Sequence, residues 1–355
     1  KRTYRNGDLG PLIHHEMNRC IHCYRCVRFY REYSGYRDFG ALGIGRRVYY
    51  GRFADGPLES PFSGNLVDLC PTGVFTDKPS RYRARRWDLQ RGDSICLHCG
   101  LGCRTVAGVR YREVLRQEAR FCPEVNGHFI CDRGRYGFGY ASAPDRPRQA
   151  TVDGRTVSRD TALETAATRL REVIARHGPE AVAAVVSPRS SLETVGMVRR
   201  VRRDLGWPVF FGLDADRART VRAAVGRLDA GLTASLADLE RADFILTVGA
   251  DPLAEAPMAA LALRRAVVNG ATLAVIDPRP VNLPVPERSH HLLVSPAGMA
   301  PCLGALVKAG LRADAGDLPA GGPAELYRTL PDDCGAPDAI AAQSPILAEA
   351  RRVAV

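Results

Sequence analysis

The sequence contains no long hydrophobic run and almost no lysine. Its longest apolar stretches, such as residues 181–186, are far shorter than the ~18 residues that a membrane helix needs. No segment has the pattern of a secretory signal peptide. We therefore expect the chain to meet a membrane only through partners. Since it starts at Lys1 rather than methionine and ends abruptly at Val355, we expect it to be a portion of a longer polypeptide.

The positive charge is concentrated in the first part of the chain. Residues 1–150 hold 26 Lys and Arg against 15 Asp and Glu, whereas residues 151–355 hold 24 of each. A basic half fits nucleic acid, acidic partner subunits or anionic thiolate clusters. Because the same half holds nine of the 11 cysteines, we favour metal–thiolate clusters, with zinc modules that bind nucleic acid as an alternative.

The cysteines are spaced for metal binding rather than for disulfides. Most of them lie in tight runs or follow such runs at motif spacing, and neighbours that close bind metal more readily than they bridge one another. The pattern favours a reducing, cytosolic compartment. A length of 355 residues predicts two or three domains.

The stretch "CIHCYRCVRFY" begins an iron–sulfur motif and then departs from it. Cys20, Cys23 and Cys26 have the spacing of a bacterial ferredoxin run, but Tyr30 stands where the fourth cysteine is expected. The next suitable cysteine before a Pro is Cys70.

A second ferredoxin run that ended at Cys70 would have cysteines at positions 60, 63 and 66, where the sequence has Ser60, Ser63 and Leu66. In two-cluster ferredoxins the fourth cysteine of each run ligates the other cluster. One [4Fe-4S] site is therefore complete and its neighbour has lost all four cysteines. A zinc site is the alternative, although zinc sites usually pair two short hooks. The complete set is Cys20, Cys23, Cys26 and Cys70.

A second group of cysteines follows in "SICLHCGLGC". Cys96, Cys99 and Cys103 supply three ligands, and Cys131 in "FICDRGRYG" is the preferred fourth, with Cys122 as its rival. Glycines in this run let backbone N–H groups approach the sulfurs. Other residues are assigned lesser roles: His14 and His15 as surface or hydrogen-bonding groups, His22 and His98 as groups near the clusters, and Cys302 and Cys334 as isolated thiols.

The second half alternates amphipathic helices with short apolar strands, which predicts a doubly wound parallel sheet. Ligands of such sheets bind beyond the carboxyl ends of the strands. The expected helices lie at 158–178, 191–206 and 257–270, and the expected strands at 181–187, 207–212, 242–251 and 271–280.

Several segments resemble the G-type subunit of bacterial NADH-quinone oxidoreductase (respiratory complex I), a relative of the molybdopterin oxidoreductases. They are "GPLIHHEMNRCIHCYRCVR", "LESPFSGNLVDLCPTGVFTDK", "RRWDLQ" and "CDRGRYGFGYASAPDRPRQ". The resemblance implies a multidomain α/β and α+β chain. It would have a ferredoxin-like [4Fe-4S] module at 1–90, a small [4Fe-4S] domain at 91–150, and a doubly wound parallel α/β domain of molybdopterin-oxidoreductase type at 151–355.

The same resemblance implies an electron relay from NADH and FMN toward quinone, not the NADH or quinone site itself. The implied partners are the NADH/FMN-binding, [2Fe-2S], ferredoxin-type and quinone-module subunits on the cytoplasmic side of the bacterial plasma membrane. A [2Fe-2S] domain and a further [4Fe-4S] cluster are expected before Lys1.

The resemblance also implies that Asp277 and Arg279 would contact the nucleotide of a molybdenum cofactor. We expect this pocket to be vestigial, because no molybdenum ligand is evident; Asp214 and Asp216 are weak candidates. The alternative function is the molybdenum-containing large subunit of an NAD-dependent formate dehydrogenase. That family generally keeps both ferredoxin-like clusters.

Overall fold

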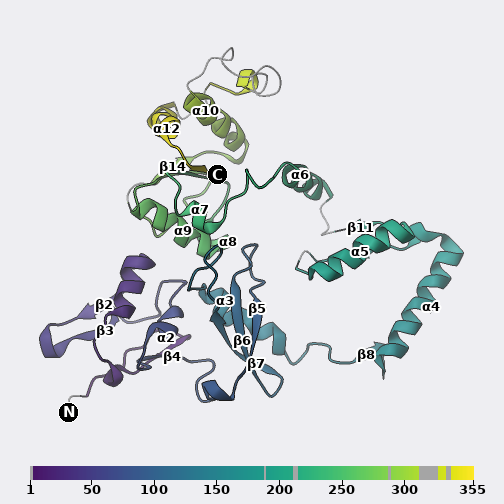
Figure 1. Ribbon diagram of the computed structural model, residues 1–355, viewed down its shortest axis with the longest axis horizontal. Coiled ribbons are helices and arrows are strands. Elements are labelled where there is room, and N and C mark those ends of the chain that lie inside the picture. The colour runs from purple at the N-terminus through teal and green to yellow at the C-terminus, as the bar shows by residue number, and fades with distance from the viewer. Residues whose placement is uncertain (1–2, 188, 211–214, 287–288, 312–326, 333–336) are drawn as a thin grey trace. The chain divides into compact units, whose positions relative to one another are not determined.

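The computed structural model describes residues 3–187, 189–210, 215–286, 289–311, 327–332 and 337–355. Contacts divide the chain into two compact units (Figure 1). Unit 1 comprises residues 1–141 and 234–355, and unit 2 comprises residues 142–233. The three-domain division at residues 90 and 150 stays a prediction.

The first part of unit 1 consists of short strands and turns around a buried aromatic core. Strand β1 pairs with β4 and β2 pairs with β3, both antiparallel. Phe39, Phe62 and Leu66 are completely buried in this core. The elements are β1 (Ile13–His15), η1 (Met17–Arg19), α1 (Arg25–Val27), the π-helical turn η2 (Arg28–Tyr33), β2 (Phe39–Leu42), η3 (Gly45–Arg47), β3 (Tyr49–Arg52), α2 (Asn65–Leu69), β4 (Phe75–Asp77) and η4 (Arg86–Asp88).

A three-stranded antiparallel sheet follows, with α3 packed against its last strand. Cys96 and Cys103 lie on either side of the connection between its first two strands, and Cys131 is the N-cap of α3. The elements are β5 (Gln90–Ile95), β6 (Arg104–Arg110), β7 (Glu113–Ala119), α3 (Asp132–Tyr136) and η5 (Gly137–Ser142).

The rest of unit 1 is a parallel sheet of four strands in the order β14-β13-β12-β15. Alternate residues of β12 enter different cores: Ile245 packs with α9, whereas Phe244 and Leu246 pack with α10. Helices therefore cover both faces, as a doubly wound sheet requires. The strands are β12 (Phe244–Val248), β13 (Thr272–Asp277), β14 (Ser289–Leu293) and β15 (Val353–Ala354); the helices are α7 (Leu236–Leu239), α8 (Pro252–Glu255), α9 (Pro257–Val268), η7 (Pro296–Gly298), α10 (Met299–Leu311) and α12 (Pro337–Glu349).

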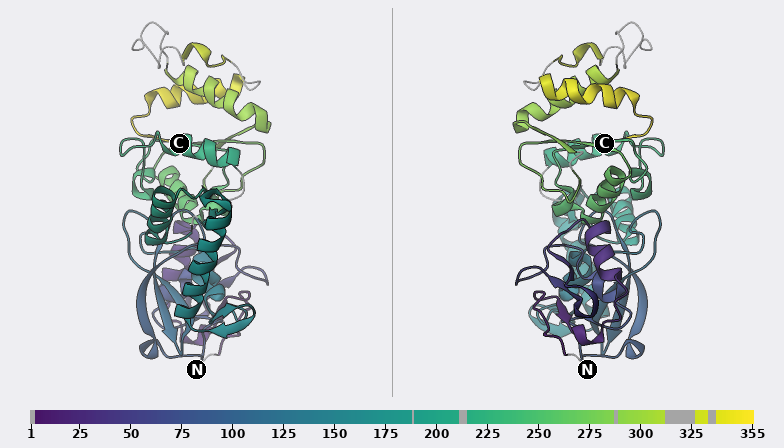
Figure 2. Two further views of the ribbon diagram at one scale, coloured as in Figure 1. Left: turned by 90° about the vertical axis from the view of Figure 1, so that its right-hand side faces the viewer. Right: turned by 90° about the vertical axis from the view of Figure 1, so that its left-hand side faces the viewer.

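Helices α10 and α12 lie side by side in both views of Figure 2 and contact each other. The expected helix at 257–270 and the expected strands at 242–251 and 271–280 are confirmed as α9, β12 and β13. None of the helices in the described part of the chain has both the length and the hydropathy needed to span a bilayer.

Unit 2 contains the two long helices that the sequence predicts. Ser158 and Gly178 cap α4, and Ser191 and Gly206 cap α5. The expected buried strand at 181–187 is wrong in extent: only two residues pair, and Val185 is 68% exposed, because the single parallel partner is equally short. The elements are β8 (Ala150–Val152), β9 (Arg155–Val157), α4 (Arg159–His177), η6 (Pro179–Ala181), β10 (Ala184–Val185), α5 (Leu192–Leu205), β11 (Val209–Phe210) and α6 (Ala215–Val225).

One arginine of α9 joins the parallel sheet to the cysteine-rich part of unit 1. The guanidinium of Arg264 donates from Nε to the Tyr33 carbonyl at 3.1 Å and from Nη2 to the Glu32 carbonyl at 3.0 Å. Its Nη1 donates to the Pro284 carbonyl at 2.7 Å. Glu32 and Tyr33 are the last residues of η2, whose carbonyls a helix leaves without partners. Arg264 therefore caps the helical segment that follows Cys26.

We expect Arg264→Ala to lower the free energy of unfolding by about 1.5–3 kcal/mol, because hydrogen bonds from a charged donor to three partly buried or exposed carbonyls are lost. Arg265→Ala is the matched control. Arg265 pairs with Glu240 at 2.9 Å and lies over the Tyr33 ring, 5.5 Å from its centroid, but it is partly exposed and should contribute about 1 kcal/mol. Thermal unfolding of both variants checks this difference, and equal losses would contradict the role given to Arg264.

Candidate metal centres

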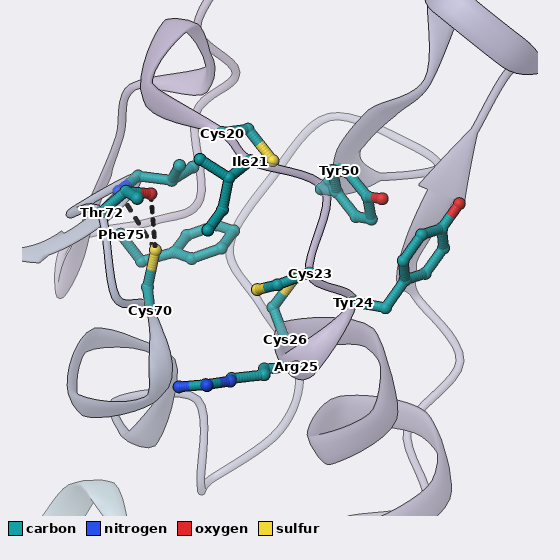
Figure 3. A pocket seen from close by; sticks show the side chains of 11 residues that line it. Cys20, Ile21, Cys23, Tyr24, Arg25, Cys26, Tyr50, Cys70, Thr72 and Phe75 are labelled. Carbon is teal, nitrogen blue, oxygen red and sulfur yellow. Dashed lines mark hydrogen bonds between the residues drawn. The ribbon is translucent and has the colours of Figure 1, made fainter.

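Four cysteine thiols line one small cavity in the first part of unit 1. Cys20, Cys23 and Cys26 come from one loop and the start of α1, and Cys70 comes from the C-terminal end of α2 (Figure 3). These are the four cysteines that the two broken ferredoxin-type runs predict. The cavity is also lined by Ile21, Tyr24, Arg25, Tyr50, Thr72, Val74 and Phe75.

The loop between Cys20 and Cys26 turns through two residues in the left-handed region. His22 has φ 57° and Tyr24 has φ 62°. Non-glycine residues rarely adopt this conformation, and it persists where the surrounding structure imposes it, often at functional sites. These two turns allow the thiols of Cys20, Cys23 and Cys26 to line the same cavity.

Backbone N–H groups point at the sulfurs of this first cavity. The His22 N–H donates to Cys20 Sγ at 3.3 Å, and the Val74 N–H donates to Cys70 Sγ at 3.2 Å. Such donors stabilise thiolates and tune the potential of a bound iron–sulfur cluster. The donor set of four thiols with N–H groups therefore fits an iron–sulfur cluster.

The thiols differ in how readily they ionise. Burial raises the pKa of Cys20, and it raises the pKa of Cys26 to about 12. Burial also acts on Cys70, but backbone N–H groups, among them those of Phe75 and Thr72, outweigh it and lower the pKa of this thiol. Because thiolates are the ligating form, metal binding at this site must release protons.

A second small cavity is lined by the other four predicted cysteines, Cys96, Cys99, Cys103 and Cys131. The Gly134 N–H donates to Cys131 Sγ at 3.4 Å. A Cβ on Gly134 would lie 3.2 Å from Cys96 Sγ, so glycine allows the backbone to approach the sulfurs. His98, Ile130, Arg133, Gly134, Pro257 and Met258 complete the lining.

The rival ligand Cys122 does not line this cavity in the part of the chain that the structure describes. Its N–H donates to the Gly127 carbonyl at 3.0 Å, within a turn of its own. Geometry therefore favours Cys131 over Cys122 as the fourth thiol of this group.

The thiols of this second group are hard to ionise without a metal. Burial raises the pKa of Cys131, and it raises the pKa of Cys103 to about 12.

No group of three or more His, Cys, Asp or Glu side chains among the described residues is gathered tightly enough to hold a single metal ion. The two sets of cysteines instead surround cavities.

Tyr30, which replaces the fourth cysteine of the first run, is fully buried. Its hydroxyl donates to Asp38 Oδ1 at 2.8 Å and accepts from the Ser60 N–H at 3.1 Å. Ser60 stands at the first cysteine position that the second run has lost. The structure thus brings together two residues that the sequence assigns to the lost cluster, and hydrogen bonds now join them.

His15 is buried beside the first site. Its Nδ1 accepts from the Gly7 N–H at 3.3 Å and lies 3.2 Å from the Tyr49 hydroxyl, while its ring stacks on Phe75. Burial lowers the pKa of His15 to about 4. The imidazole is therefore neutral in the folded protein at neutral pH, in agreement with the hydrogen-bonding role expected from the sequence.

This depressed pKa predicts a pH dependence. In the unfolded chain His15 takes up a proton near pH 6.5, and in the folded chain only near pH 4. The contribution of His15 to the free energy of unfolding is therefore fully present above pH 6.5 and is lost as the pH drops toward 4. The loss due to His15 should reach about 2 kcal/mol at pH 5. Unfolding of His15→Phe should lack this component between pH 7 and 5, whereas the exposed His177→Phe should retain it; identical profiles would contradict the assignment.

The remaining candidates lie elsewhere. Asp277, at the end of β13, is buried and bound by Arg279, whose N–H and Nε donate to Oδ1 at 2.8 and 3.1 Å. The side-chain hydrogen bond from Arg279 lowers the pKa of Asp277. Asp216 is paired with Arg219 on the surface. Cys302 belongs to α10 and is buried in the core between that helix and the sheet. Asp214 and Cys334 lie outside the described residues.

Comparisons with known proteins cover both halves of the chain. Residues 10–76 match the ferredoxin-like domain of NADH-quinone oxidoreductase subunit 3, and residues 153–308 match the molybdopterin oxidoreductase family. The G-type subunit of NADH-quinone oxidoreductase from Shewanella oneidensis is 46% identical over 276 residues, and that from Escherichia coli is 44% identical over 276 residues. Each alignment covers 75% of this chain and 29% of the relative.

Among solved structures, acetylene hydratase from Pelobacter acetylenicus is similar in fold, with a TM-score of 0.51 and 16% identity over 72% of this chain and 38% of that one. This likeness and the two family matches confirm the expected combination of a ferredoxin-like module with a molybdopterin-oxidoreductase-type α/β fold. The chain spans 29% of the length of these NADH-quinone oxidoreductase relatives. On this evidence the chain is a homologue of part of the G-type subunits of NADH-quinone oxidoreductase, similar to them over 75% of its own length.

Proposed function

We propose that this chain is an iron–sulfur electron-transfer part of NADH-quinone oxidoreductase, with two [4Fe-4S] clusters. Cys20, Cys23, Cys26 and Cys70 hold the first cluster, and Cys96, Cys99, Cys103 and Cys131 hold the second. The observation that carries the proposal is that each predicted set of four thiols lines its own cavity. The similarity to the G-type subunits supports the assignment to this oxidoreductase.

A bound [4Fe-4S] cluster supplies one-electron redox chemistry. The chain contributes ligands, N–H donors to the sulfurs and shielding from water. At the first site Phe75 and Tyr50 are buried and form part of the wall, while the more exposed Ile21 also lines it. Hydrogen bonds and limited solvent access are the means by which a protein sets a cluster's potential.

The proposed partners are the other subunits of the oxidoreductase: the NADH/FMN-binding, [2Fe-2S], ferredoxin-type and quinone-module subunits. Electrons from NADH would enter through the flavin and leave toward quinone. In this proposal the chain lies peripherally on the cytoplasmic side of the bacterial plasma membrane.

We further propose that the α/β part serves as a scaffold without a molybdenum cofactor. The two residues proposed to contact its nucleotide, Asp277 and Arg279, are hydrogen-bonded to each other. Arg279 engages both oxygens of the carboxylate and leaves fewer of its lone pairs free for a nucleotide base. This internal pairing supports a relay rather than a dehydrogenase.

Reduction by NADH in the assembled complex tests the function. Rapid freeze-quench EPR should show the first cluster reduced within the turnover time, as a relay requires. The comparison is the complex with its flavin site blocked, in which the cluster should stay oxidised. A first cluster that remains oxidised while the complex reduces quinone at its normal rate would refute the relay.

A further inference from the structure

We propose that the loop at 61–65 positions Cys131 and so shapes the second cluster site. This loop carries Ser63, one of the positions at which the second ferredoxin-type run has lost its cysteine. The inference rests on the proposed function, in which Cys131 is a ligand. In this proposal a remnant of the lost cluster site supports the other site, through a residue 69 positions further along the sequence.

Asp132, the residue after Cys131, is bound to this loop by three hydrogen bonds. Its carboxylate accepts from Ser63 Oγ at 2.6 Å and from the Gly64 N–H at 2.7 Å. Its own N–H donates to the Pro61 carbonyl at 2.7 Å. Hydrogen bonds to a carboxylate are among the strongest in proteins. Together the three contacts fix the backbone and the side chain of Asp132 to this loop.

Ile130, the residue before Cys131, is bound by Asn65. The Asn65 side chain donates to the Ile130 carbonyl at 2.8 Å and accepts from the Ile130 N–H at 3.3 Å. Asn65 is 1% exposed, so water does not compete for these bonds. Both chain neighbours of Cys131 are thus held by the same short segment, which leaves the thiol little freedom to change direction.

The loop at 61–65 also packs tightly against the start of α3. A Cβ on Gly64 would lie 2.5 Å from Arg135 Cδ and 2.8 Å from Asp132 Oδ1. Arg135 is 1% exposed and pairs with Asp68 of α2 at 2.7 Å. The loop and the start of α3 therefore pack without space between them, and a rigid support of this kind is what orients a metal ligand.

Ser63→Ala tests this proposal, because it removes the hydrogen bond from Ser63 Oγ to Asp132 and keeps the backbone hydrogen bonds of the loop. In the purified, iron-loaded protein we expect iron to leave the second cluster about tenfold faster with a chelator, the factor that matches loss of one hydrogen bond to a charged group. The EPR signal of the second cluster should shift, and that of the first should not. Ser63→Thr keeps the hydroxyl and should restore both readouts.

Ser60→Ala is the matched control, since Ser60 lies next to the same buried loop but its hydroxyl accepts from the Phe62 N–H at 3.3 Å, away from Asp132. Asn65→Ala should act like Ser63→Ala, from the other side of Cys131. Unchanged iron release and EPR spectra in both Ser63→Ala and Asn65→Ala would overturn the inference. If the wild-type protein holds no second cluster, the proposed function itself is wrong for this site, and the inference, which depends on it, fails as well.

Discussion

Replacing Cys70 by alanine should abolish the first cluster, or convert it to a form with fewer irons, and leave the second intact. The other three thiols of this site come from one loop, whereas Cys70 alone approaches from the end of α2. Three cysteines do not fully ligate a cubane cluster. Low-temperature EPR should therefore lose or change one of two reduced signals, and iron content should fall by up to about half.

Cys122→Ala provides the comparison. Cys122 is partly exposed and does not line either cavity among the described residues, so both signals should persist. If Cys70→Ala leaves both clusters unchanged, the pairing of Cys70 with the first run is wrong. If instead the second signal disappears, the two cysteine sets have been assigned to the wrong partners.

Gly64→Ala should lower the free energy of unfolding by about 1–3 kcal/mol, although the change adds only one methyl group. The new Cβ would meet Arg135 Cδ at 2.5 Å and Tyr136 Cε2 at 2.9 Å. Arg135 is itself buried and is held by Asp68, so it cannot move aside without breaking this ion pair. The temperature at which cluster absorbance is lost should fall accordingly.

Gly92→Ala is the control for this substitution. Gly92 lies in the exposed strand β5, and a Cβ there would meet no atom within 4 Å. The free energy of unfolding of the Gly92→Ala variant should differ from that of the wild-type protein by less than about 0.5 kcal/mol. Equal unfolding temperatures for Gly64→Ala and the wild-type protein would show that the loop at 61–65 is not closely packed.

Much of the site can be predicted from the sequence, because cysteine spacing is a local pattern with a chemical cause. The first run and the lone Cys70 of the second predict four thiols that the structure places around one cavity. Helix ends are equally predictable, since Ser158 and Gly178 satisfy the terminal backbone groups of α4. The identity of Cys131 as the fourth thiol requires a choice that spacing alone leaves open.

The long-range contacts could not be predicted. Arg264 reaches a carbonyl 231 residues away in the sequence, and Met258 lines the second cavity from the start of α9. Such contacts depend on tertiary packing and leave no periodicity in the sequence. The short strand β10 is overestimated for a similar reason: an apolar run predicts burial, but its length as a strand depends on a partner to pair with.

The most direct test of two iron–sulfur clusters on this chain is the metal content of the purified protein, combined with low-temperature EPR. We expect about eight irons per chain, two distinct reduced [4Fe-4S] signals, and neither molybdenum nor zinc. Stoichiometric molybdenum would contradict the relay in favour of a dehydrogenase, and zinc in place of iron would contradict both cluster sites.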